Sequence, residues 1–249
     1  MHDAAPPSPA VVVGIDGSRR AIGAALWAVD EAADRDLPLR LICAMEPRDV
    51  PVADEIASAT SALRQAAVAV ESTGRPVKIE TDAVRGDAAD VLLAASRAAA
   101  MLCIGALGVN HATGRRPGSV ASVLLPRATS PVAIVRTDAP RADDDRWIVT
   151  EQRETPGGAT VLALAIDEAR LRDAPLRVIG GTHAERSLAR YRLRYPNLDV
   201  EALSIRGKAV DHLADLAHDI QLLVVGPDRC HQLTQLSCSV LVAGRHGAL

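Results

Sequence analysis

Residues 30–42, DEAADRDLPLRLI, recur at residues 167–179 as DEARLRDAPLRVI. Nine of the thirteen aligned positions are identical, and the alignment needs no gap. In the first copy, this stretch begins in a segment whose apolar residues recur at helical spacing. It ends in a short apolar run that is typical of a buried strand. Such a match at a fixed separation indicates an internal repeat.

The repeat extends beyond this stretch. VRGDAADVLL (84–93) aligns with IRGKAVDHLA (205–214), and MLCIG (101–105) aligns with LLVVG (222–226). The polar, Pro-containing segment TDAPRADDDR (137–146) separates the two copies and is interpreted as a linker. We therefore expect two domains, residues 9–137 and residues 146–249, with the second copy shorter in its second helix and after its fourth strand.

Within the first copy, strand-like and helix-like segments alternate. We expect strands at 10–15, 39–45, 77–84, 101–105 and 131–136, separated by helices at 20–36, 53–74 and 87–99 and by a fourth helix that follows a glycine-containing loop and runs to about 129. This alternation predicts right-handed βαβ units, and therefore an α/β fold with a parallel sheet.

The composition argues against several functions. The 249 residues include no Phe, two Trp and two Tyr, and the net charge is −3, so neither nucleic acid nor an anionic membrane is an expected partner. No run of 18 apolar residues and no signal-peptide pattern is seen. The four cysteines lack Cys-x-x-Cys spacing, and we expect a cytoplasmic protein.

The stretch GALGVNHATGRRPGS (105–119) follows the fourth expected strand and contains three glycines. It lacks the lysine of a P-loop, and either a tight turn or an anion-binding loop would explain it. In a parallel sheet, ligands bind beyond the carboxyl ends of the strands, which would place this loop opposite Asp16. For Asp16 itself, a role as a turn residue capping the next helix is the alternative.

The spacing G-x-x-G, nine residues, then G-S, at Gly105, Gly108, Gly118 and Ser119, is similar to the nucleotide-binding pattern of the universal stress protein family. The opening VVVGIDGS (11–18) resembles that family too. Two concatenated copies resemble the tandem type of mycobacteria and related actinobacteria. The resemblance implies two adenine-nucleotide-hydrolase-like units, each a five-stranded parallel sheet of order 3-2-1-4-5 with helices on both faces.

The resemblance also implies a binding site for ATP, with Mg as an optional companion. Asp16 would meet the adenine or ribose edge. The other implied contacts are Ile15 and Ala44 at the base, Gly105 and Gly108 at the ribose and α-phosphate, and Gly118, Ser119 and Val120 at the outer phosphates. One departure is Ala121, which stands where many members of the family have a hydroxyl; Ser122 comes one residue late.

We therefore expect a nucleotide-responsive regulator of adaptation to stress such as hypoxia or dormancy. No Walker lysine, acidic metal pair or positioned base is seen, so the expectation is a protein that is not an enzyme, with weak ATP hydrolysis at most. Two alternatives are a nucleotide-free interaction module and a slow ATPase. The second copy lacks the glycine series and is expected not to bind. Candidate partners are a second copy of the chain and a regulatory protein.

Overall fold

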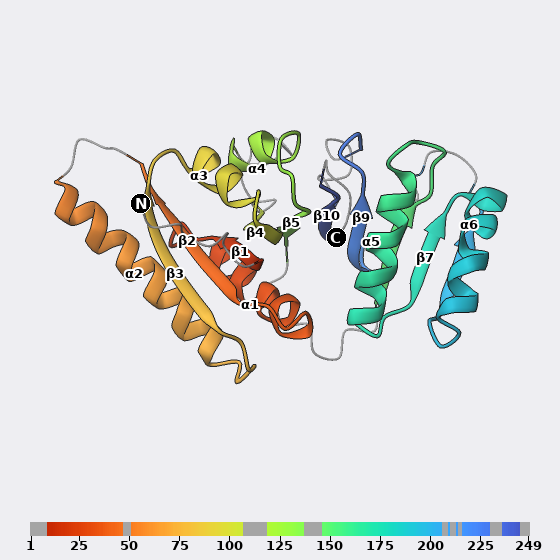
Figure 1. Cartoon of the computed structure of the whole chain (residues 1–249), viewed down its shortest axis with the longest axis horizontal. Helices are drawn as coiled ribbons and strands as arrows, with labels where there is room; N and C mark the ends of the chain where they lie inside the picture. The colour runs from red at the N-terminus through yellow and green to blue at the C-terminus, as the bar shows by residue number, and fades with distance from the viewer. Residues whose placement is uncertain are drawn as a thin grey trace, which may run out of the picture. The chain divides into compact units, whose positions relative to one another are not determined.

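A computed structural model describes residues 9–46, 51–106, 119–136, 146–205, 209, 213, 216–229 and 236–244. The chain divides into two compact units (Figure 1). Unit 1 contains the described residues up to 136, and unit 2 contains those from 146 onward. In the described part of the chain, no helix is long and apolar enough to cross a membrane.

Unit 1 is built on a parallel sheet. Its strands are β1 (Ala10–Gly14), β2 (Leu39–Met45), β3 (Ile79–Arg85), β4 (Ala99–Gly105) and β5 (Val132–Val135). They lie in the order β3-β2-β1-β4-β5, with every pair parallel. The expected strand order is thereby confirmed. From β1 the chain adds β2 and β3 on one side, and then adds β4 and β5 on the other side of β1. The point at which the strand order reverses therefore lies between the neighbouring strands β1 and β4.

In the described part of unit 1, these strands are connected by the helices α1 (Arg19–Asp34), α2 (Val52–Glu71), α3 (Ala88–Ala95) and α4 (Ser119–Leu124) (Figure 1). The first two helices pack beside each other, as do α3 and α4. Right-handed crossovers place the two pairs on opposite faces of the sheet. Both faces of the central strands are therefore covered, and Val11, Val13 and Leu102 are completely buried.

Unit 2 repeats the topology. The elements described in it are β6 (Trp147–Glu151), α5 (Gly158–Leu171), β7 (Leu176–Ile179), α6 (Gly181–Arg194), β8 (Val200–Leu203), β9 (Ile220–Val225) and β10 (Ser239–Val242). The strands lie in the order β8-β7-β6-β9-β10, which corresponds strand by strand to β3-β2-β1-β4-β5 of unit 1. As expected from the sequence, the second helix of this copy is shorter, with 14 residues in α6 against 20 in α2.

The quoted repeat has the same local structure in both units. Asp36 and Asp173 occupy equivalent turn positions and adopt left-handed backbone conformations, with φ of 54° and 48°. At the end of each helix lies a glutamate–arginine ion pair with a buried glutamate: Glu31–Arg35, in which Arg35 is partly exposed, and Glu168–Arg172, in which both side chains are buried. The repeat therefore preserves both a turn and a charge pair, which accounts for the identity of the glutamate, arginine and aspartate at these three positions.

Candidate functional site

A cavity of about 630 Å³ lies at the carboxyl ends of the strands in unit 1. Residues at the ends of β1, β2 and β4 line it, together with the first turns of α1 and α4 and parts of α2 and α3. The volume is within the usual range for small-molecule sites, roughly 300–1,000 Å³. Its position, where the strand order reverses, is where ligands bind in open α/β sheets.

The turn after β1 forms one wall of the cavity. The Asp16 carboxylate accepts a hydrogen bond from the Ser18 N–H through Oδ1, at 2.9 Å. Gly17 has φ of +80°, and the Ser18 hydroxyl caps α1 by accepting from the Ala21 N–H. Asp16 therefore does shape the turn, yet its side chain is exposed and lines the cavity. Its Oδ2 atom remains available to a ligand.

The end of β2 forms another wall, where Cys43 and Ala44 line the cavity. Burial raises the pKa of the Cys43 thiol above its ordinary value, and the negative charge of Asp16 raises it further. At neutral pH the thiol therefore stays protonated. Cys43 and Ala44 present uncharged groups, which suit a planar base better than a phosphate, and the Glu46 carboxylate follows them in the lining.

Gly105 ends β4 and also lines the cavity. A Cβ atom at this position would lie 2.6 Å from the carbonyl oxygen of Arg20, in the first turn of α1. The neighbouring Ala106 N–H donates to the Val135 carbonyl. Gly105 is therefore required for the close packing of β4 against α1.

Five of the eight residues implied by the resemblance line this one cavity: Ile15, Asp16, Ala44, Gly105 and Val120. Gly108 and Gly118 lie outside the described residues. Ser119 begins α4, and its side chain is also outside the description. Ala121 lines the cavity, whereas Ser122 is exposed and not part of the lining. A step of one residue turns about 100° around a helix, so Ser122 does not replace the missing hydroxyl.

The sequence interpretation missed the contribution of α2. Asp54, Glu55 and Ser58 from this helix line the cavity. Asp54 and Glu55, together with Asp16 and Glu46, bring four carboxylates to the described lining. The described lining has one guanidinium group, that of Arg20. The signal was present in the acidic first turn of α2, but only the tertiary fold brings that turn to the cavity.

These carboxylates can accept hydrogen bonds from ribose hydroxyls or an adenine amino group, and they repel phosphates. Within the described ranges, no three His, Cys, Asp or Glu side chains cluster closely enough to hold a metal ion. The described lining therefore suits a nucleoside better than a phosphate group.

Comparison with known proteins gives the family. The model of the universal stress protein family matches residues 9–136. A universal stress protein of Mycobacterium tuberculosis strain H37Rv is 39% identical over 269 aligned residues, covering 95% of this chain and 96% of the relative. A second one from that strain is 40% identical over 258 residues, covering 94% and 96%. This chain belongs to the universal stress protein family.

A solved structure of similar fold supports the tandem architecture of this universal stress protein. The crystal structure of a universal stress protein from Archaeoglobus fulgidus DSM 4304 has a TM-score of 0.78 and 15% sequence identity. The match covers 96% of this chain and 100% of that one. At this identity the comparison shows the shared fold alone.

Unit 2 of this universal stress protein differs at the equivalent place. Strand register makes Glu151 the counterpart of Gly14, and Arg153 the counterpart of Asp16. Arg153 pairs with Asp228 at 3.0 Å, and Arg229 pairs with Glu151 at 3.1 Å. Both pairs connect the end of β6 to the segment after β9. Ion pairs therefore lie where unit 1 has its ligand-sized opening.

Proposed function

We propose that this universal stress protein binds an adenine nucleotide, ATP foremost, in the unit 1 cavity. The observation that carries the proposal is the cavity at the carboxyl ends of β1, β2 and β4, lined by five of the residues that the family resemblance implies. Asp16, Cys43 and Ala44 would supply contacts for ribose and base. The glycine-containing segment between Ala106 and α4 would supply the phosphate contacts.

The same proposal gives the protein a regulatory role. Occupancy of unit 1 by nucleotide would report the energy state of a cytoplasm under stress such as hypoxia or dormancy. Rapid hydrolysis is not part of the proposal, because the described lining offers carboxylates but no grouped metal ligands to neutralise a transferring phosphate. A magnesium ion would be held by the nucleotide phosphates and water.

Two serines on α2 provide a matched test. Ser58 lines the cavity, whereas Ser61, one turn further along, is exposed and outside the lining. Calorimetric titration of the full chain with ATP should show binding to the parent and to Ser61→Trp. Binding to Ser58→Trp should be weakened at least about tenfold, because the indole ring would occupy part of the cavity.

Equal affinity of the two variants would contradict the proposed location. Failure of the parent protein to bind ATP, AMP or cyclic AMP would favour the nucleotide-free interaction module. Steady release of phosphate above background, abolished by Ser58→Trp and retained by Ser61→Trp, would favour the slow ATPase.

A further inference from the structure

Helix α6 in unit 2 concentrates positive charge in a chain whose net charge is −3. Its sequence, GTHAERSLARYRLR, contains four arginines and one glutamate. Arg186, Arg190 and Arg194 are four residues apart and all exposed. At this spacing they form a row along one side of the helix, about 12 Å long.

These three arginines have no carboxylate partner among the described residues. The fourth arginine of the helix, Arg192, differs in this respect, because it pairs with Glu185 at 2.6 Å. The Nε of Arg186 donates only to the Thr182 carbonyl, at 3.4 Å. Favourable interaction with the helix dipole explains basic residues in the last turn, but Arg186 and Arg190 lie before that turn.

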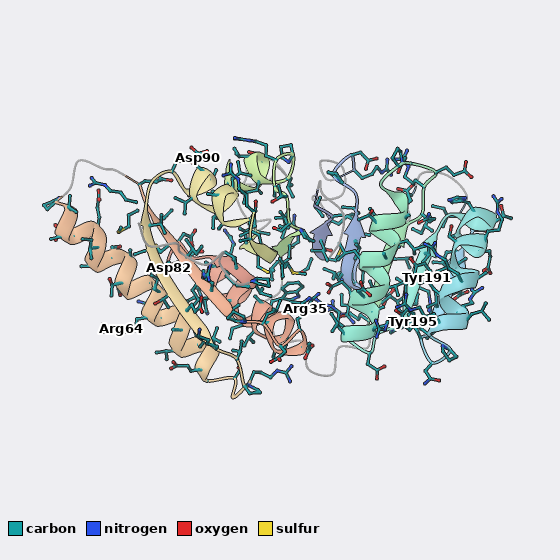
Figure 2. The ribbon with its side chains drawn as sticks, in the orientation of Figure 1. Arg35, Arg64, Asp82, Asp90, Tyr191 and Tyr195 are labelled. Carbon is teal, nitrogen blue, oxygen red and sulfur yellow. The ribbon has the colours of Figure 1, made fainter. Side chains whose placement is uncertain are left out.

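Two tyrosines hold part of the row in place. Arg190 lies over the Tyr191 ring, 4.6 Å from its centroid, and donates to the Tyr191 hydroxyl at 2.9 Å. Tyr195 has Arg194 at 5.3 Å and Arg170 of α5 at 4.2 Å from its ring centroid. Figure 2 shows both tyrosines on the side of α6 that faces α5. The guanidinium groups of Arg190 and Arg194 are therefore pre-organised, which lowers the entropic cost of binding a partner.

An apolar side chain accompanies the row. Leu193 is 87% exposed, the most exposed large apolar residue in the described part of the chain. It follows Arg186 by seven residues and Arg190 by three, so it projects from the same side of α6. Arginine is enriched at protein interfaces, and Leu193 would add an apolar contact beside the row of arginines.

We propose that Arg186, Arg190, Leu193 and Arg194, here called the α6 arginine surface, bind an acidic protein segment that carries apolar side chains. Guanidinium groups form bidentate hydrogen bonds with carboxylates, and Leu193 would contact an apolar residue of the partner. Nucleic acid fits less well, because arginines already lie over both tyrosine rings and so restrict base stacking. This inference is independent of the nucleotide site in unit 1.

The test uses the full-length protein and a fluorescently labelled peptide that repeats Glu-Glu-Leu, followed by anisotropy. The parent should bind this peptide and not its Lys-Lys-Leu counterpart, and added salt should weaken the binding. Arg186→Ala/Arg190→Ala should weaken it roughly tenfold or more, since hydrogen bonds to charged groups are lost. Leu193→Ser should weaken it roughly three- to tenfold without lowering the unfolding temperature, because this side chain is already exposed.

The matched control is Arg64→Ala, which removes an exposed arginine from α2 in unit 1 (Figure 2) and should leave peptide binding unchanged. Three results would overturn the proposal. The first is a loss of peptide affinity in Arg64→Ala equal to that in Arg186→Ala/Arg190→Ala. The second is equal affinity of the parent for the acidic and basic peptides. The third is tighter binding of duplex DNA or of phosphatidylglycerol vesicles than of the acidic peptide, with the same dependence on Arg186 and Arg190.

Discussion

Replacing Gly105 by alanine separates two reasons for a glycine at this position. One reason is the approach of a ligand to the backbone, and the other is packing against α1. The structure places an added Cβ 2.6 Å from the carbonyl oxygen and 2.7 Å from the carbonyl carbon of Arg20. Both are backbone atoms in the first turn of α1, so neither can rotate away as a side chain would.

The magnitude follows from this overlap. Because contacts under 3.0 Å to backbone require the structure to shift, Gly105→Ala should displace β4 or the start of α1. Overpacking of this kind typically costs about 1–3 kcal/mol. With each kcal/mol lowering the unfolding temperature of a chain of this size by about 2–4 °C, we expect a decrease of roughly 2–12 °C.

Gly226 provides the matched control, because strand register makes it the unit 2 counterpart of Gly105. A Cβ there would lie 2.6 Å from Oδ1 of Asp228, which is the end of an exposed side chain and can move. Differential scanning calorimetry without nucleotide should therefore show a clear loss for Gly105→Ala and a small one for Gly226→Ala. An unchanged unfolding temperature in Gly105→Ala would refute the packing explanation.

Further predictions concern the buried charges, the stoichiometry and the cavity walls. Glu168→Ala removes the buried carboxylate that pairs with the buried Arg172 side chain at 3.1 Å, and should reduce the free energy of unfolding by about 3–5 kcal/mol in urea titrations. Asp167→Ala, on the exposed side of the same helix, should reduce it by about 0–1 kcal/mol. Calorimetry should give one nucleotide per chain, because ion pairs lie at the equivalent place in unit 2; two equivalent sites would contradict this. Since the pKa of Cys43 is raised, iodoacetamide should modify it slowly at neutral pH and faster only above the ordinary thiol pKa of about 8.5, as followed by peptide mass spectrometry. Asp16→Ala should weaken ATP binding about ten- to a hundredfold by loss of one polar contact.

The repeat made most of the fold predictable. The run LRLICAM was expected as a strand at 39–45, and β2 has those bounds. Other boundaries moved by one to several residues, because local hydrogen bonds end the helices. The helix expected at 87–99 ends at Ala95, where the Ser96 hydroxyl donates to the Leu93 carbonyl and β4 begins soon after. Periodicity does not contain such capping information.

The candidate site was only partly predictable. Ile15 and Gly105 could be placed because they stand at the ends of expected strands whose order the family resemblance implied. The side chains of α2 could not, because helical periodicity does not say that Ser58 faces a cavity. The explanation for Gly105 also changed: a glycine after a strand suggested ligand approach, whereas its nearest neighbour is the backbone of Arg20. That contact joins residues far apart in sequence.

The most direct test of nucleotide binding in unit 1 is a crystal structure of the full chain soaked with ATP. We predict density for the nucleoside in the cavity between the ends of β1 and β4, beside Ile15, Ala44 and Gly105. The phosphates should extend toward the segment that precedes α4. Nucleotide density in unit 2 beside the Arg153–Asp228 pair, or an empty unit 1 cavity in crystals exposed to saturating ATP, would contradict the account.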